Sequence, residues 1–461
     1  MSLASPFKTP FRLGTLVVLG LLLLIPLSMV RGLVDERQSR SREVKNEIAG
    51  KWGMPQQLLP PIVSVPWVRT TVLKSGKTER KESWVRLFPE TLEVVGELST
   101  QTRRRGLFKV PVYTAALDWN GAWNLDQIRR HSPGAGWVLD PTRAVVSVDP
   151  GTARSLSKAP LLELDGHAVE IAAERPTGSV HAMHLHSRPF ALGGSRRLHF
   201  HLALSQRGTE SFSIAPAAGA TTVRLKSDWK SPSFQGDFLP ERSTISATGF
   251  DASWGVSGMN LGIPTIWRDG DAPLPASVRR DYGEDQVASS SSSRLQAPVL
   301  AVSLVEPVDG YDSIDRSLKY GALVIALAFL ALFLFESFLN RALHPVQYGL
   351  IGLSLALFYL LLLSISEHLG FETAYAIAAS AVTGTVAGYA SAALAGWKRG
   401  LLLGTGLAIL WGFLFTLLKA EDWALLMGST GLFLIVTLVM WLTRKIDWNR
   451  RDLANPPDAK D

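Results

Sequence analysis

The chain of 461 residues contains no cysteine. This absence excludes disulfide bonds, thioether-linked haem and thiolate metal sites together. A large domain of this protein must therefore be held by its own hydrophobic core. The long segment between residues 31 and 319 is large enough to build one, because a domain of that size buries most of the surface of its unfolded chain.

Sequence motifs of common catalytic and nucleotide-binding sites are also missing. There is no GxxxxGK[ST], HExxH, GxSxG or CxxC pattern. Ser155-Leu156-Ser157-Lys158 fits SxxK, which would pair a nucleophile with a base, but so short a match in a Pro- and Gly-rich region is weak evidence. We therefore predict no catalytic residues, no cofactor and no metal ligands.

What the chain has instead is long apolar runs, one at the start and five close together near the end. Each run approaches the roughly 20 residues that cross a bilayer core, and such runs are helices because lipid offers no partner for backbone polar groups. The runs are 13–30, 320–339, 348–365, 374–395, 401–418 and 423–442. The sequence thus predicts an α-helical membrane protein with six transmembrane helices, the last five forming a bundle over 320–442.

The first run also resembles a secretory signal peptide, since Lys8 and Arg12 precede its leucines. Residues 28–30 offer no small-x-small cleavage site, however, and Pro26 lies inside the run. We interpret this run as an uncleaved anchor.

Orientation follows from the basic residues of the short loops, which stay on the cytoplasmic side. With the N-terminus inside, the short outside loops hold only Lys419, and ten basic residues lie inside: Lys8, Arg12, Arg341, Lys398, Arg399, Arg444, Lys445, Arg450, Arg451 and Lys460. We predict that both the N-terminus (1–12) and the tail (443–461) are cytoplasmic, with 31–319 on the outside of the membrane. These inside charges also account for much of the net charge of +7, so we expect a lipid bilayer and no nucleic acid as partner.

The segment 31–319 changes from helical to alternating patterning. A charged stretch from Val34 to Ala49 predicts a surface helix ended by Gly50 and Gly53. Short β-type runs follow at 62–65, 84–88, 92–98, 110–116, 144–148, 168–172, 180–186, 198–204, 221–225 and 300–305. Turn residues separate them, which predicts a large antiparallel β-rich domain, a sandwich or an open barrel. The serine-rich stretch 279–296 is predicted to be a solvated loop or linker.

Five of the nine histidines lie within 181–201: His181, His184, His186, His199 and His201. Gly193 and Gly194 lie between two pairs, so a hairpin could gather imidazoles that bind Zn²⁺ or Cu²⁺. The other interpretation, which we prefer, is that the histidines form the polar, solvent-facing side of a β-ribbon whose other side is buried. Whether the cluster binds metal stays open.

Ionisable residues inside or near the apolar runs are candidates for function by default. Glu336 lies late in the second run. The end of the third run carries Ser364, Ser366, Glu367, His368 and Glu372. Gly384 and Gly388 form a GxxxG pattern, extended by Ser380 and Ala392, which predicts close helix packing and no substrate.

Sequence segments along the chain resemble the CreD family of inner-membrane proteins. In the long segment they are Glu47-Ile48-Ala49 with Trp52-Gly53, 105–113 (RGLFKVPVY), 231–236 (SPSFQG) with Phe238-Leu239-Pro240, and 306–311 (EPVDGY). Among the apolar runs they are 344–350 (HPVQYGL), 358–364 with Ser366-Glu367-His368 and Phe371-Glu372, 421–429 (EDWALLMGS) and 443–448 (TRKIDW). Departures are local: Pro60, Asp312, the histidines and the serine run.

The resemblance implies a cell-envelope integrity protein of Gram-negative inner membranes, connected with colicin tolerance and two-component control, without established catalytic residues. We therefore expect a non-enzymatic membrane protein with envelope partners. Two alternatives stay open: a transporter or lipid-handling protein, supported by Glu336 and the five-helix bundle, and a metal-dependent periplasmic enzyme, supported by the histidines. The sequence leaves open the partner, the oligomeric state and the roles of Glu336 and Glu367.

Overall fold

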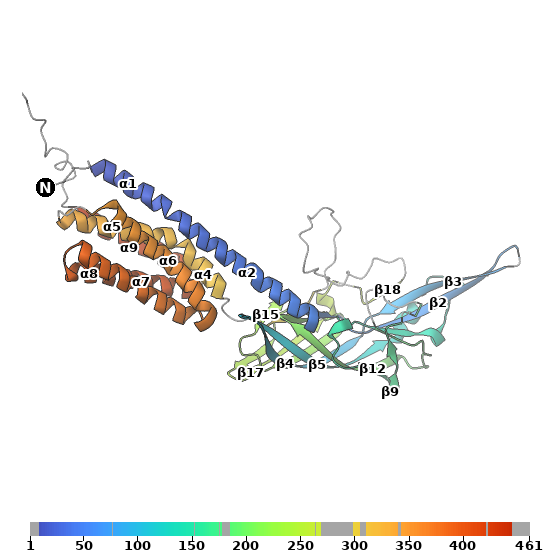
Figure 1. Ribbon diagram of the computed structural model, residues 1–461. Coiled ribbons are helices and arrows are strands. Elements are labelled where there is room, and N and C mark those ends of the chain that lie inside the picture. Colours follow the sequence, from blue (N-terminus) through green and yellow to red (C-terminus); the bar gives the residue numbers. More distant parts are fainter. Residues whose placement is uncertain are drawn as a thin grey trace, which may run out of the picture. The chain divides into compact units, whose positions relative to one another are not determined.

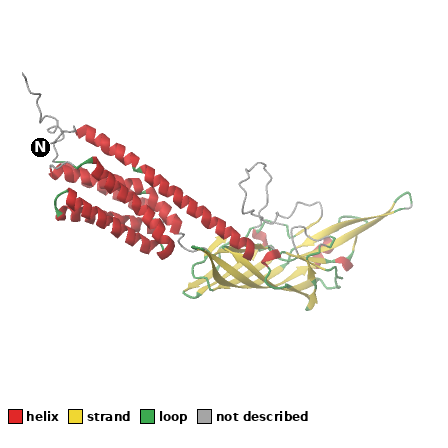
Figure 2. Ribbon diagram, in the orientation of Figure 1, coloured by secondary structure: helices red, strands yellow, loops and turns green. Residues whose placement is uncertain are grey.

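The computed structural model describes residues 9–75, 77–151, 153–174, 176–177, 185–262, 264–268, 298–304, 310–339, 343–420 and 423–444. The chain divides into two compact units, residues 1–42 with 308–461 and residues 43–307. Figure 2 shows that helices make up the first and strands most of the second. We call them the helical unit and the β unit. Both ends of the β unit fall inside the predicted segment 31–319.

The helical unit contains α1 (Thr9–Leu22), the first part of α2 (Leu24–Trp52), α4 (Gly310–Lys319), α5 (Gly321–Leu339), α6 (Pro345–Leu369), α7 (Phe371–Ala393), α8 (Trp397–Lys419) and α9 (Ala424–Thr443). Figure 1 shows α5 to α9 running side by side. Four helical stretches of the described chain are long and apolar enough to cross a membrane, and the α4–α5 pair, bent by 45°, makes a fifth if it counts as one span. The apolar part of α9, Leu425–Trp441, is shorter. The structure thus supports four or five of the six predicted spans.

Helix α2 corrects the predicted boundary between the first span and a separate surface helix. The structure has one continuous helix from Leu24 to Trp52, and the interruption lies earlier, at Leu23. Pro26 explains that position, because proline has no N–H to donate to the carbonyl of Leu22. Gly50 lies within α2, and Gly53, with φ of 154°, follows its end.

The close contact between α7 and α8 corrects the predicted GxxxG interface. A side chain added at Gly384 or Gly388 would meet open space, whereas one at Gly400 would collide with Ala387 and Ser391 of α7. Small residues allow this approach from α8. The GxxxG pattern of α7 therefore faces away from the packed interface.

The β unit contains β1 (Gln56–Leu58), β2 (Ile62–Val72), β3 (Thr78–Leu87), β4 (Thr91–Arg105), β5 (Phe108–Asn124), β6 (Val138–Leu139), β7 (Val145–Val148), β8 (Leu161–Leu164), β9 (His167–Val169), β10 (Ile171–Ala172), β11 (Leu185–Ser187), β12 (Arg197–Thr209), β13 (Ser211–Ile214), β14 (Ala220–Ser227), β15 (Ser233–Gly236), β16 (Arg242–Ser246), β17 (Gly249–Ser257), β18 (Ile266–Arg268) and β19 (Leu300–Ser303). One short helix, α3 (Leu125–Arg130), follows β5. Single turns of 3₁₀ helix cover Pro141–Arg143, Ala153–Ser155 and Gly258–Asn260.

These strands form three sheets. The largest has the order β16-β17-β14-β4-β5-β12-β8-β9, the second β10-β11-β7-β2-β3-β18 with β6 on β2, and the third β1-β13-β19-β15. Neighbouring strands are antiparallel as predicted, except that β4 pairs with β14 and β1 with β13 in parallel. Every predicted β-type run contains strand residues, although 180–184 and 305 lie outside the described residues, as does the predicted loop 279–296.

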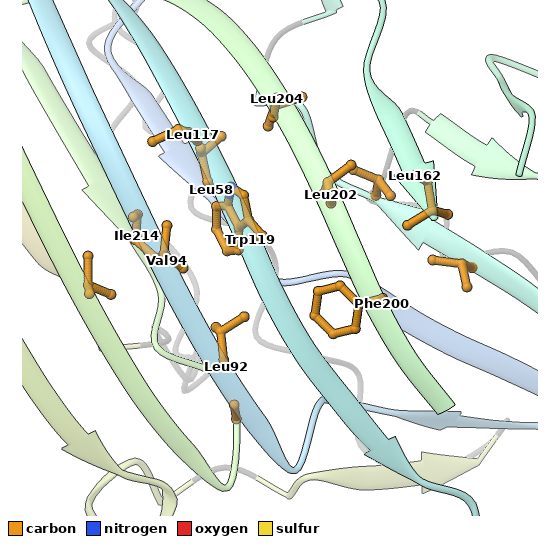
Figure 3. Packing of buried hydrophobic residues seen from close by; sticks show 14 of the residues in the cluster. Leu58, Leu92, Val94, Leu117, Trp119, Leu162, Phe200, Leu202, Leu204 and Ile214 are labelled. Carbon is orange, nitrogen blue, oxygen red and sulfur yellow. The ribbon is translucent and has the colours of Figure 1, made fainter. Parts of the chain in front are cut away.

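Alternating residues of the long strands build the core of the β unit. Along β4, Leu92 and Val94 are buried while Glu93 between them is exposed. Figure 3 shows these side chains converging with Trp119 of β5 and Phe200 of β12. Valines of β2 and β7 belong to the same cluster, so the first two sheets share one core. Gly121 lies opposite Phe200, and the phenyl ring occupies the space that a side chain at position 121 would need.

Candidate functional site

Glu367, near the end of α6, is held by two other helices of the helical unit. Its side chain is only 9% exposed, and its carboxylate lies 3.5 Å from Nε of Arg37 on α2. The hydroxyl of Tyr311 on α4 donates a hydrogen bond to its Oε1 at 3.1 Å. A carboxylate so enclosed keeps its charge only if cationic or hydrogen-bonding groups replace water. The three side chains therefore form a junction, which we call the Glu367 junction.

The short helix α4 extends this junction with further polar contacts. Gln38 Nε2 donates to Oδ1 of Asp312 at 2.9 Å. One turn on, Asp315 lies 3.7 Å from Nε of Arg31 and 3.1 Å from Nζ of Lys319. The opposite side of α4 is buried, which makes the helix amphipathic. Helix α4 thus contacts α2 by charge and α6 by a hydrogen bond.

Glu336 on α5 also contacts a tyrosine of a neighbouring helix. Tyr348 of α6 is 2% exposed, and its hydroxyl donates to Oε2 of Glu336 at 2.9 Å. A hydrogen bond to a charged group is stronger than a neutral one. Both predicted acidic candidates therefore accept a hydrogen bond from a tyrosine of another helix, Glu367 from α4 and Glu336 from α6.

The remaining residues predicted at the end of the third span do not join the Glu367 junction. Ser364 and His368 bond to each other locally, through the Ser364 carbonyl and the His368 ring at 3.2 Å. Ser366 donates to the Leu363 carbonyl within the helix. Glu372, on α7, is 69% exposed and pairs with Lys419 at 2.6 Å. These groups have local or surface roles.

The structure separates the predicted histidine pairs. His186 lies on β11 of the second sheet and is 1% exposed, with Nδ1 3.1 Å from the Ser147 hydroxyl. His199 and His201 lie on β12 of the largest sheet. The predicted hairpin is wrong because both edges of β12 are occupied, by β5 and by β8. His181 and His184 lie outside the described residues.

The neighbours of the β12 histidines come from other segments of the chain, on β5, on β8 and in the turn after β8. His199 Nδ1 lies 3.3 Å from Asp165. His201 lies between Asp118, at 3.5 Å, and Glu163, at 3.8 Å. Across the described part of the chain, no group of three His, Cys, Asp or Glu residues is placed to hold a metal ion. Sequence spacing did not reveal these carboxylates because they lie far from the histidines along the chain.

The β unit buries a carboxyl group, that of Asp149, which the sequence did not single out. Asp149 is 6% exposed and accepts from the backbone N–H groups of Gly151, at 2.9 Å, and Leu59. Burial raises its pKa to about 7. Ser155, from the discarded SxxK match, lies nearby and is buried, 3.4 Å from Gln56 Oε1, whereas Lys158 is exposed. The two residues that the SxxK match would pair, a buried serine and an exposed lysine, therefore lie in different environments.

Four or five apolar helices and a separately cored β unit define a multi-span membrane protein with a large additional domain. A family model described as inner membrane protein CreD matches residues 8–449. Inner membrane protein CreD of Escherichia coli (strain K12) is 33% identical over 463 residues, which cover 98% of this chain and 97% of that protein. The chain belongs to the CreD family and is an inner-membrane protein, which confirms the resemblance.

Solved structures offer only a remote likeness. Two M1 zinc metallopeptidase structures from Deinococcus radiodurans, the second of a mutant bound to substrate, have TM-scores of 0.18 and 0.20 at 10% identity. The matches cover 37% and 47% of this chain, and 38% and 42% of the peptidases. A likeness at this level carries no argument about fold or activity.

Proposed function

We propose that this chain is a non-enzymatic inner-membrane protein that supports the integrity of the cell envelope, with its β unit contacting envelope components in the periplasm. The observation that carries the proposal is the match to a CreD protein from end to end, over 98% of this chain. A match of that extent includes both units, so what the family does draws on the helices and the β unit together.

The periplasmic side is proposed from charge. Lys398 and Arg399 fall where α7 gives way to α8, and Lys419 ends α8. The excess of basic residues on one set of loops favours that set as cytoplasmic, which leaves residues 31–319 outside. Reporter fusions after Lys319 and Glu421 should then be active only as periplasmic reporters, and a fusion at Asp461 only as a cytoplasmic one. A cytoplasmic signal at Lys319 would refute the orientation.

Envelope partners are tested best by photocrosslinking in living cells. A photoreactive residue at Met259 or Val138, which are 95% and 69% exposed in the β unit, should capture specific envelope components. Leu438, 55% exposed on α9, is the matched position in the helical unit and should capture lipid instead. If captures from the β unit match those from Leu438, or if a deletion strain shows no envelope defect, the proposal fails.

A transporter is the second candidate, and the Glu367 junction with Glu336 favours it. Ionisable groups at depth in a membrane protein often mark ion or substrate paths. Here each carboxylate accepts a hydrogen bond from a tyrosine of another helix. Such a hydrogen bond also joins the two helices, so a purely structural role is the alternative. Replacing Glu336 and Glu367 by glutamine separates the two roles. A joining role predicts a destabilised protein that still complements a deletion strain, and a transport role predicts a stable protein that does not.

A further inference from the structure

The end of the β4–β5 hairpin exposes an apolar residue between basic ones. Strand β4 ends at Arg105 and β5 begins at Phe108, so Gly106 and Leu107 form a two-residue turn. Gly106 has φ of 58°, the conformation that a type II′ turn requires at its first central position. The turn leaves the Leu107 side chain 47% exposed. A leucine at the tip of an otherwise ordered hairpin is available for contact.

The charges next to this turn are not balanced. Register places Arg104 directly opposite Lys109, and like charges in that position destabilise a ladder. Both side chains are exposed, and among the described residues neither has an ion-pair partner. Arg105, by contrast, pairs with Glu47, and the Arg103 guanidinium lies 4.5 Å above the Trp52 ring. These two contacts hold the hairpin, and Arg104 and Lys109 are left for an anion.

The β2–β3 hairpin shows that such basic residues can be neutralised inside the β unit. There Arg80 lies 3.4 Å from Glu82 and 3.5 Å from Asp140, and Lys81 lies 3.5 Å from Glu79. The β4–β5 end lacks acidic residues within the stretch 99–116. Its uncompensated charge is therefore a property of this hairpin and not of every hairpin in the β unit.

We propose that the β4–β5 hairpin end docks on anionic phospholipid headgroups, with Arg104 and Lys109 against phosphates and Leu107 in the apolar boundary. Charge complementarity selects this partner, because anionic lipid surfaces attract basic residues near them. An adjacent apolar side chain strengthens the binding by inserting into the boundary between headgroups and acyl chains. The chain is an inner-membrane protein, so a bilayer is always present. The proposal is independent of the envelope role and of the side on which the β unit lies.

The absence of cysteine makes a clean test available. Leu107→Cys, labelled with an environment-sensitive fluorophore, is reconstituted as the full-length chain into phosphatidylcholine vesicles with and without phosphatidylglycerol. We expect a blue-shifted, brighter emission only with phosphatidylglycerol, and quenching by lipids spin-labelled near the headgroup. Leu239→Cys, 71% exposed between Asp237 and Glu241, is the control and should not respond.

Charge variants decide the interpretation. Arg104→Gln with Lys109→Gln in the labelled chain should lower the response to phosphatidylglycerol by about an order of magnitude. Soluble inorganic phosphate should not reproduce the blue shift, because it brings no apolar boundary. Equal spectra with and without phosphatidylglycerol, or a response that survives both substitutions, overturns the proposal. Arg188→Gln with Arg224→Gln removes the same number of positive charges from two exposed arginines, paired with Glu170 and Asp251, and controls for net charge.

Discussion

The β unit and the helical unit place ionisable side chains by different rules. Along a strand every second residue points away from the core, so charges reach solvent and pair there, as Arg224 of β14 does with Asp251 of β17 at 2.8 Å. A carboxylate among packed helices does not reach solvent in this way. Glu367 and Glu336 are instead bound by tyrosines of neighbouring helices.

This difference teaches which acidic groups depend on particular partners. The carboxyl group of Asp140 has a lowered pKa, through its hydrogen bond with Thr142 first and the Arg143 guanidinium beside it. Asp149 has a raised pKa because burial disfavours its charge and only backbone N–H groups face it. Folding therefore stabilises the ionised form of Asp140 and destabilises the ionised form of Asp149. Four substitutions test and sharpen these contrasts.

The largest effect is expected in the shared core of the β unit. Trp123 is fully buried and its ring centroid lies 4.4 Å from that of Phe200. Trp123→Ala should lower the free energy of unfolding by about 3–5 kcal/mol, because the cavity cannot be refilled. Limited proteolysis should then cut the β unit while the helical unit, with its own core, stays intact. Val95→Ala, on the exposed face of β4, should change nothing, and equal proteolysis of both variants would contradict the prediction.

The second test concerns the pH dependence of the β unit. The pKa of Asp149 is about 7 against an ordinary value of 3.8, so folding disfavours its ionised form. Below pH 3.8 the carboxyl group is neutral in both the folded and the unfolded chain, and the protein has its full stability. As the pH rises from 3.8 towards 7, the free energy of unfolding falls by roughly 4 kcal/mol at most, and above pH 7 it stays at the lower value.

Asp149→Asn removes this titration while keeping an oxygen to accept from Gly151. The difference in unfolding free energy between the variant and the parent should grow between pH 4 and 7, in favour of the variant. Chemical denaturation across that pH range measures it. A difference that does not change with pH would show that Asp149 is not the titrating group.

The third test compares two glycines of the helical unit, Gly400 and Gly388. Gly400→Leu should push α7 and α8 apart and cost roughly 1–3 kcal/mol, because an added side chain collides with Ala387 and Ser391. Gly388→Leu, on a face with open space, is the matched control. Thermal stability in detergent distinguishes them. If Gly388→Leu is the more damaging change, the GxxxG pattern of α7 packs after all.

The smallest effect is expected at the Glu367 junction. Tyr311→Phe removes one hydrogen bond to a poorly exposed carboxylate and should cost about 1–2 kcal/mol. Glu372→Gln breaks an exposed pair with Lys419, and such surface pairs contribute at most about 1 kcal/mol. Added salt should weaken the second contact and not the first. Equal salt sensitivity would place Glu367 in solvent rather than among helices.

The amino-acid sequence by itself determined the class and the family of this protein. Apolar runs and alternating runs are local patterns, because hydropathy and side-chain period act over neighbouring residues. They predicted helices at α5 to α9 and strands at β2 to β5. The colinear segments that resemble CreD proteins run through both units, which is why the family could be identified before any coordinate was known.

Only the tertiary structure decided which distant residues meet. The parallel pairing of β4 with β14, the separation of His186 from His201 and the partners of Glu367 all join residues far apart in sequence. The tertiary structure also decided that Gly400 of α8, and not Gly388 of α7, lies in the close contact between these two helices. Sheet register and helix rotation set these contacts through the burial of whole faces, and no short pattern in the sequence carries that information.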